Sequence, residues 1–210
     1  MNQTANQAQQ PRLATIVVAG GQGTRMGGVD KASVKVHGVR LVDRLIAQLP
    51  SATDYVVVSP RELGLPLTCE QPPFGGPVAG IHAGFEYLLH RHPDLEFIAT
   101  LPVDAPDSPQ ILPRLFAAIT ADSSAGVALI RSQDGSLQNL CGIWRTSALK
   151  NAFDQLGSPR NQSVRRLLAQ AGRIIEAEGT GEEQDYDTRQ EADAYISSAS
   201  ENVRRAKLDH

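Results

Sequence analysis

The sequence predicts an α/β fold, a three-layer, Rossmann-like and mainly parallel sheet with helices on both faces. Two observations lead to this prediction. Short continuous runs of β-branched and other apolar residues recur along the chain, as is typical of strands buried on both faces of a sheet. Between these runs lie segments whose apolar positions repeat at helical spacing. Alternation of this kind favours βαβ crossovers and therefore parallel strands.

Six runs are predicted to be strands. The first is LATIVVA at 13–19, which is rich in β-branched residues and ends at two glycines. The others are 54–59, 95–101, 126–130, 138–144 and the weaker run 172–177.

The helical spacing predicts helices over 39–49, 78–89, 164–171 and 192–199. A further helix is expected to start near Ser108, with Asp107 or Ser108 as its N-cap. Because the pattern contains no linker rich in Pro, Gly or Ser, we predict a single domain over 13–196. Residues 1–12 are polar without an apolar signal core and are expected to be a disordered leader, and 197–210 a charged C-terminal tail.

Composition excludes several classes of protein. The net charge of −3 argues against a nucleic-acid binder that neutralises many phosphates. No apolar run approaches the roughly 20 residues that span a bilayer, so we expect no membrane contact. Cys69 and Cys141 stand far apart without a CxxC or Cys/His cluster. These features are typical of a cytoplasmic protein in a reducing compartment.

The loop at 17–31, directly after the first predicted strand, is a candidate phosphate-binding site. It contains five glycines, which allow backbone N–H groups to converge on an anion, and two cations, Arg25 and Lys31. The loop is not a P-loop, and Met26 occupies the place of the third glycine in the dinucleotide fingerprint. The alternative interpretation is a flexible turn whose charges are solvated.

Asp104 is a candidate metal ligand. It follows the run at 95–101 between Pro102 and Pro106, at the expected carboxyl edge of the sheet. Mg²⁺ bound to phosphates typically takes one or two protein carboxylates, so a single aspartate is sufficient. The alternative is an aspartate that caps the helix expected near Ser108.

The string AGGQGTRMGGVDK, which ends at Lys31, resembles the signature of the molybdenum cofactor guanylyltransferases, members of the nucleotide-sugar-transferase-like superfamily. The run VDAP around Asp104 is similar to the family's C-D-x-P, and GGPVAG at 75–80 to its G-P-L-A-G. The resemblance implies a nucleotide-diphospho-sugar-transferase-like fold and a nucleotidyltransferase domain. It also implies that Arg25, Lys31 and Asp104 are catalytic and that Asp104 holds Mg²⁺. The nucleotide-binding set implied by the resemblance is Val18, Ala19, Gly20, Gly21, Gly23, Arg25, Lys31, Ser59, Glu70, Gly76, Gly80 and Asp104.

Two of these assignments, Glu70 and Ser59, depend on further observations. Glu70 precedes GGPVAG, and a carboxylate can accept hydrogen bonds from both N1–H and N2–H of guanine. Ser59 stands where the family often has Asn. Further along, 185–189 resembles the family's segment at the pterin side of the cleft, and 161–166 could hold a second phosphate or be a solvated helix face.

The activity implied by the resemblance is transfer of GMP from GTP to molybdopterin, which releases pyrophosphate and forms the guanine dinucleotide cofactor. Its implied partners are the two small-molecule substrates and, transiently, the enzymes that deliver or receive the cofactor. Three alternatives stay open at this point. They are cytidylyl transfer to the same acceptor, nucleotidyl transfer to a sugar phosphate, and a non-catalytic nucleotide-binding regulator.

Overall fold

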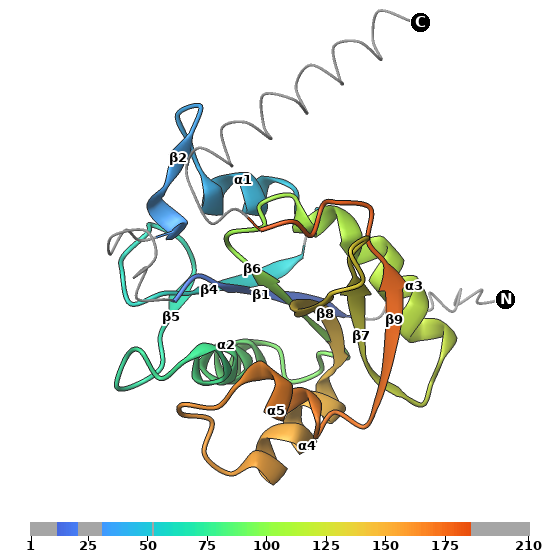
Figure 1. The fold of residues 1–210 in the computed structure, drawn as a ribbon. Coiled ribbons are helices and arrows are strands. Elements are labelled where there is room, and N and C mark those ends of the chain that lie inside the picture. The colour runs from blue at the N-terminus through green and yellow to red at the C-terminus, as the bar shows by residue number, and fades with distance from the viewer. Residues whose placement is uncertain (1–11, 21–30, 52, 186–210) are drawn as a thin grey trace, which may run out of the picture.

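The computed structural model describes residues 12–20, 31–51 and 53–185. Within these residues, seven strands form one sheet in the order β5–β4–β1–β6–β8–β7–β9 (Figure 1). Their bounds are Leu13–Val18 (β1), Asp54–Val58 (β4), Leu67–Thr68 (β5), Phe97–Pro102 (β6), Ala125–Arg131 (β7), Leu137–Arg145 (β8) and Arg173–Glu178 (β9). Neighbouring strands of this described sheet are parallel, except that β8 runs antiparallel to β6 and β7. The predicted α/β class with a mainly parallel sheet is confirmed.

The first strand lies in the parallel half of the sheet and is covered on both faces. Ile16 and Val17 are both fully buried, yet they belong to different hydrophobic clusters, because successive side chains of a strand point to opposite faces. Val17 pairs with Val57 of β4 on one side and with Leu101 of β6 on the other. The unbroken apolar run therefore matches a strand with a helical layer above and below it.

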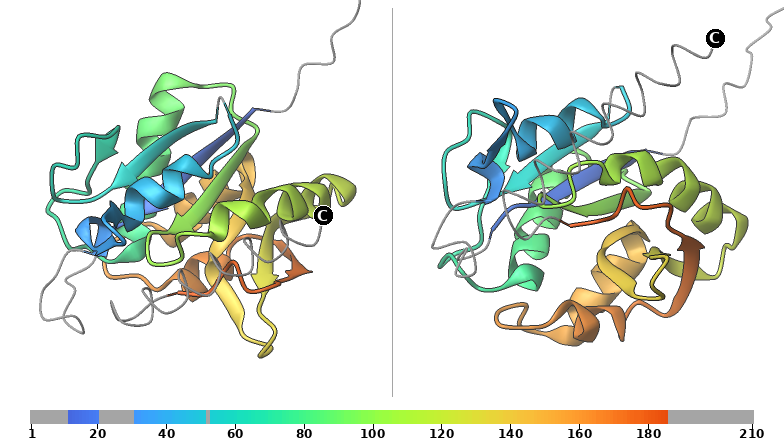
Figure 2. Two further views of the ribbon diagram at one scale, coloured as in Figure 1. Left: turned by 90° about the horizontal axis from the view of Figure 1, so that it is seen from above. Right: turned by 45° about the horizontal axis from the view of Figure 1, so that its top comes forward.

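Helices form the two outer layers, and the turned views of Figure 2 show both layers against the sheet. Their bounds are Leu41–Ala47 (α1), Pro77–Arg91 (α2), Leu112–Ala121 (α3), Thr146–Leu156 (α4) and Val164–Leu168 (α5), with 3-10 turns at Lys31–Ser33 (η2) and Ser108–Ile111 (η3). The helices α2, α4 and α5 pack on the face to which Ile16 points. The helices α1 and α3 pack on the opposite face, to which Val17 points.

The predicted helix over 39–49 is wrong at both ends, because α1 begins at Leu41 and ends at Ala47. His37 and Gly38 have φ of 50° and 84° and reverse the chain. Val39 consequently pairs with Val36 in a hairpin made of β2 (Lys35–Val36) and β3 (Val39–Arg40). Val39 is 50% exposed, so it is an apolar residue of the hairpin and does not contribute to the buried face of a helix.

The helix predicted over 164–171 begins as expected but ends at Leu168, as α5. The helix expected near Ser108 begins as η3 and continues as α3. The helix α4 was not predicted, since its buried residues Leu149, Ala152 and Phe153 show helical spacing over only about one turn. The predicted helix over 192–199, the leader up to residue 11 and the tail 197–210 lie outside the described residues.

Candidate active site

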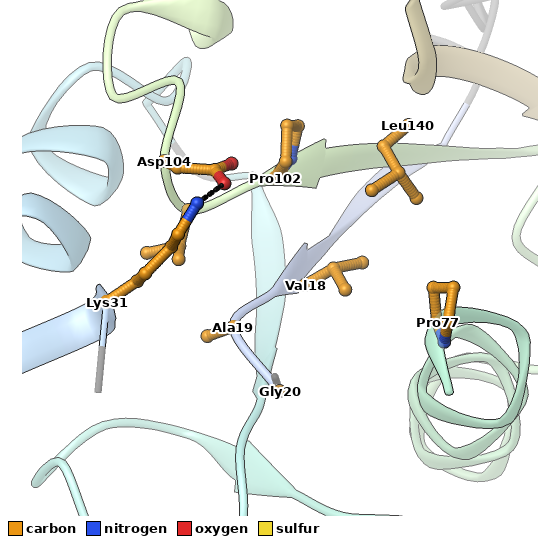
Figure 3. Close-up of a pocket in the computed structure, with 9 residues that line it drawn as sticks. Val18, Ala19, Gly20, Lys31, Pro77, Pro102, Asp104 and Leu140 are labelled. Carbon is orange, nitrogen blue, oxygen red and sulfur yellow. Dashed lines mark hydrogen bonds and ion pairs between the residues drawn. The ribbon is translucent and has the colours of Figure 1, made fainter. Parts of the chain in front are cut away.

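A pocket of about 190 Å³ opens at the carboxyl ends of β1 and β6 (Figure 3). After β1 the chain passes to β4 on one side of that strand and then to β6 on the other. Such a reversal in strand order is where ligands bind in open α/β sheets. The pocket is lined by Val18, Ala19, Gly20, Lys31, Pro77, Pro102, Val103, Asp104 and Leu140.

The predicted cation and the predicted carboxylate meet in this pocket. Nζ of Lys31 donates a hydrogen bond of 2.6 Å to Oδ2 of Asp104, and Figure 3 shows the two side chains pointing toward each other. Lys31 opens η2, while Asp104 follows β6. Both side chains are mostly buried, with exposed fractions of 24% and 20%. Partial removal from water strengthens the field of each charge, which suits a site for charged ligands.

The end of β1 forms one wall of the pocket. The backbone N–H of Ala19 donates to the carbonyl of Val58 at 3.0 Å, and the N–H of Val103 donates to the carbonyl of Val18 at 3.1 Å. These bonds hold β1, β4 and the start of the Asp104 turn together. The pocket therefore brings together five of the residues proposed from the sequence, namely Val18, Ala19, Gly20, Lys31 and Asp104. The predicted residues Gly21, Gly23 and Arg25 lie outside the described residues.

Pro77, at the start of α2, is the residue of the GGPVAG segment that lines the pocket, across from Lys31 and Asp104 (Figure 3). The predicted residues Glu70, Gly76 and Gly80 lie behind this wall and are not among the lining residues. Gly76 is the N-cap with φ of 90°, a conformation that favours glycine, and Pro77 occupies the first turn and lines the pocket. A Cβ at Gly80 would lie 3.1 Å from Val58 Cγ1, tighter than most real contacts. Gly80 therefore also allows close packing of α2 on the sheet.

Glu70 lies beside this first turn of α2. Its Oε1 accepts a hydrogen bond of 3.0 Å from the N–H of Gly75, and its Oε2 would be 3.8 Å from a Cβ at Gly80. Burial, followed by the charge of Glu70, raises the pKa of the Cys69 thiol to about 11. Glu70 is thus oriented by the loop that leads into α2, next to the pocket residue Pro77.

Other sequence-predicted residues lie elsewhere. Ser59 is not one of the described residues that line the pocket. It is buried, and its Oγ accepts a hydrogen bond of 3.1 Å from the N–H of Arg61. Ser163 caps α5 by accepting from the N–H of Arg166, which makes that segment a helix start. Asp107 occupies the N-cap position of η3, as predicted, but its side chain makes no cap bond there. Its carboxylate instead accepts from Arg44 of α1 and from Gln48, the C-cap of that helix.

Leu140 is a pocket residue that the sequence analysis missed. It belongs to β8, which reaches the pocket because it runs antiparallel to β6. The available signal was the pair Asp134–Gly135 between two predicted strands, a dipeptide typical of hairpin turns. The neighbouring Cys141 is fully buried, and burial above all, with the charge of Asp104, raises the pKa of its thiol. Cys141 therefore remains a neutral packing residue.

Asp104 has the chemistry of a ligand for a divalent metal. A carboxylate supplies the hard oxygen that such ions prefer, and this one already lies against a cation, Nζ of Lys31. Within the described residues, no group of three or more His, Cys, Asp or Glu side chains is arranged to hold a metal. A divalent metal held by one carboxylate typically completes its coordination with phosphate oxygens and water. None of the described helices combines the length and apolar character that crossing a bilayer requires.

Residues 15–174 match the family model described as “MobA-like NTP transferase domain”, which covers more than half of the chain. A molybdenum cofactor guanylyltransferase from Cereibacter sphaeroides is 32% identical over 141 residues, which are 63% of this chain and 69% of that protein. The solved structure of molybdopterin-guanine dinucleotide biosynthesis protein A from Archaeoglobus fulgidus has a TM-score of 0.65 at 16% identity, covering 88% of this chain and 99% of its own. The solved structure of 2-C-methyl-D-erythritol 4-phosphate cytidylyltransferase from Thermus thermophilus has a TM-score of 0.62 at 16% identity. The match covers 88% of this chain and 98% of that protein. The two structural similarities show the fold alone.

Proposed function

This chain belongs to the MobA-like NTP transferase family and is a nucleotidyltransferase, and we propose that it transfers GMP from GTP to molybdopterin. The products are pyrophosphate and the guanine dinucleotide form of the cofactor. The observation that carries the proposal is the Lys31–Asp104 pair in a pocket at the switch point of the sheet. One member is a cation suited to phosphate, and the other is a carboxylate suited to a metal.

The proposed reaction is a displacement at the α-phosphorus of GTP. A phosphate oxygen of molybdopterin attacks, a new P–O bond forms, and the bond to the β-phosphate bridging oxygen breaks. Pyrophosphate leaves with the electron pair of that bond. The attacking phosphate is largely ionised near neutral pH, so the protein need not supply a general base. Its contribution is positioning and charge stabilisation.

The residues of the pocket divide these tasks. Lys31 places a positive point charge against the triphosphate, and Arg25 is proposed to contact it too. Asp104 would hold the divalent metal that enzymes of this family generally use, which we take to be Mg²⁺. When bound, this metal supplies Lewis-acid stabilisation of charge on the phosphates. Gly20 is proposed to let the nucleotide approach the backbone at the end of β1.

Glu70 is proposed to select guanine. A carboxylate only accepts hydrogen bonds, and the N1–H and N2–H of guanine are two adjacent donors. The corresponding edges of adenine and cytosine place an acceptor beside the amino group, which would face the carboxylate unfavourably. Support for this role comes from the bond between Glu70 and the Gly75 N–H, which orients the carboxylate before a base arrives.

Pyrophosphate release tests the proposed function. Purified protein with Mg²⁺ is incubated with GTP, CTP, ATP or UTP, each combined with molybdopterin or with a panel of sugar phosphates. GTP with molybdopterin is expected to give the highest turnover. A preference for CTP would show that the enzyme transfers CMP and not GMP. Turnover with sugar phosphates but not with molybdopterin would show that the acceptor is a sugar phosphate.

A further inference from the structure

Asp107 is a buried carboxylate three residues beyond Asp104, and it accepts hydrogen bonds from Arg44 of α1 and from Gln48, the C-cap of that helix. Its side chain is 7% exposed. Oδ1 accepts from Nη2 and Nε of Arg44 at 3.1 and 3.3 Å, and from Nε2 of Gln48 at 2.9 Å. A carboxylate is buried in charged form only where donors replace water. Removing one partner from such a group is therefore expected to displace the segment that carries it.

Gln48 also holds the main chain of the same turn. Its Nε2 donates to the carbonyl of Pro106 at 2.9 Å. Gln110 in turn donates to Oε1 of Gln48 at 2.6 Å, which sets the direction of the Gln48 amide. The turn between β6 and η3 is thus attached to α1 through both a side chain and a carbonyl.

The opposite end of α1 is tied to the segment that carries Lys31. The N–H of Leu41, the first residue of α1, donates to the carbonyl of Val34 at 2.9 Å, and the N–H of Val34 donates to the carbonyl of Lys31 at 3.2 Å. The helix α1 packs against both η2 and η3. One short helix therefore connects the two turns whose side chains meet in the pocket.

Fold stability alone does not explain why this network is polar. The end of β6 is already held to β1 through the N–H of Val103 and the carbonyl of Val18. An apolar contact between α1 and the turn would cover the sheet without burying a charge. Hydrogen bonds, in contrast, fix the direction and the distance between the groups they join. A side chain that binds a metal must be held in a defined orientation, and such bonds can hold it there.

We propose that Arg44, Gln48 and Asp107 are positioning residues, which hold Asp104 at the location where metal and triphosphate meet beside Lys31. The proposal rests on the proposed function of this pocket. Asp107 acts through the turn it anchors and touches no substrate. Loss of the Asp107 carboxylate is expected to reduce the gain in nucleotide affinity that the metal provides. The affinity that Lys31 provides without metal should be kept.

The test is calorimetric titration of the full-length protein with GTP, once with Mn²⁺ and once with EDTA. Wild-type protein is expected to bind GTP more tightly with the metal. In Asp107→Asn the gain in affinity from Mn²⁺ should shrink by about 10-fold or more, the size of loss that follows when groups which orient a metal ligand are removed. Affinity in EDTA should change by less than about twofold, since the Lys31 segment is held at the other end of α1.

Two further variants separate this role from a loss of folding. Gln48→Met keeps the length of the side chain, removes its donors, and should show a milder form of the same loss. Arg173→Gln breaks the 2.7 Å pair with Asp122 at the opposite edge of the sheet and should keep the full gain from Mn²⁺. An unchanged gain in Asp107→Asn and Gln48→Met, or equal losses with and without metal, would overturn the proposal. Wild-type protein that bound no GTP would instead overturn the proposed function, and this inference with it.

Discussion

Nζ of Lys31 lies 2.6 Å from Oδ2 of Asp104, although 73 residues separate the two in sequence. The contact arises because β1 and β6 are neighbours in the sheet, so that the segments following them face the same pocket. The pair joins the group proposed to bind phosphate to the group proposed to bind metal. Variants at the two positions can therefore separate these contributions.

Lys31→Gln and Asp104→Asn are expected to weaken nucleotide binding in different ways. Loss of Lys31 removes a cation from the triphosphate, so GTP affinity should fall both with Mg²⁺ and in EDTA. Loss of Asp104 removes the metal ligand alone, so only the affinity with Mg²⁺ should fall. Turnover should drop by about 10²–10³-fold in each variant, as when one charge-stabilising group is removed. Calorimetry and pyrophosphate release provide the two measurements.

The control for this comparison is Asp154→Asn, which breaks an exposed pair with Lys150 on α4. It should leave both GTP affinity and turnover unchanged, since exposed pairs contribute little. If Asp104→Asn lost as much affinity in EDTA as with Mg²⁺, Asp104 would not be the metal ligand.

Gly20→Ala is expected to impair nucleotide binding without unfolding the protein. A Cβ at Gly20 would lie 3.6 Å from the carbonyl oxygen of Val58, an ordinary contact. Stability to urea should change by less than about 0.5 kcal/mol. GTP affinity should fall by about 10-fold, because the methyl group would occupy space that the nucleotide needs.

Gly126→Ala is the matched comparison for this variant. A Cβ there would overlap the carbonyl oxygen of Ala171 at the opposite edge of the sheet, so it should destabilise the fold. Full GTP affinity in Gly20→Ala would show that no ligand approaches the chain at that point.

Glu70→Gln is expected to reduce discrimination between GTP and ITP, which lacks the 2-amino group. Wild-type protein should prefer GTP by about 10-fold or more, since a hydrogen bond to a charged group contributes roughly 1.5–3 kcal/mol. In the variant the ratio of the two affinities should approach one, while the exposed Glu62→Gln should retain the wild-type ratio. Competition binding measures both ratios. A preference for GTP that survived in Glu70→Gln would assign guanine reading to another group.

Alkylation of Cys69 should be slow at neutral pH and should accelerate toward pH 11. Burial and the charge of Glu70 raise the pKa of this thiol to about 11, so the protonated form persists at pH values where an ordinary thiol ionises. At pH 8 its reaction with iodoacetamide should be about 100-fold slower than that of an unperturbed cysteine. Mass spectrometry across a pH series gives the rate.

Glu70→Gln should increase the alkylation rate of Cys69, because removing the carboxylate lowers the pKa of the thiol. The fully buried Cys141 serves as an internal reference that should react only on unfolding. A rate for Cys69 that levelled off below pH 9 would contradict the proposed influence of burial and of Glu70.

The parallel strands of the core could be predicted, because the apolar run that indicates each buried strand lies within a few consecutive residues. Each residue of LATIVV is apolar or small, and a short run rich in β-branched residues is typical of a strand covered on both faces. The direction of β8 was not predictable in this way, since a strand's composition does not record its orientation. The hairpin that reverses the chain at Gly135, with φ of 84°, sets that direction and brings Leu140 to the pocket.

The amino-acid sequence by itself determined the fold class and the chemistry available, since a glycine-rich loop after a buried strand and an aspartate after a later one are patterns within single segments. The tertiary structure alone decided that Lys31 meets Asp104 and that Ser59 turns its hydroxyl to its own loop. It also decided that Asp107, at the N-cap position of η3, directs its carboxylate to Arg44 of α1 instead of to the N–H groups of its own helix. The physical reason is that backbone preference acts over a few neighbouring residues. Contacts between distant side chains, in contrast, depend on strand order and on how the helical layers are packed.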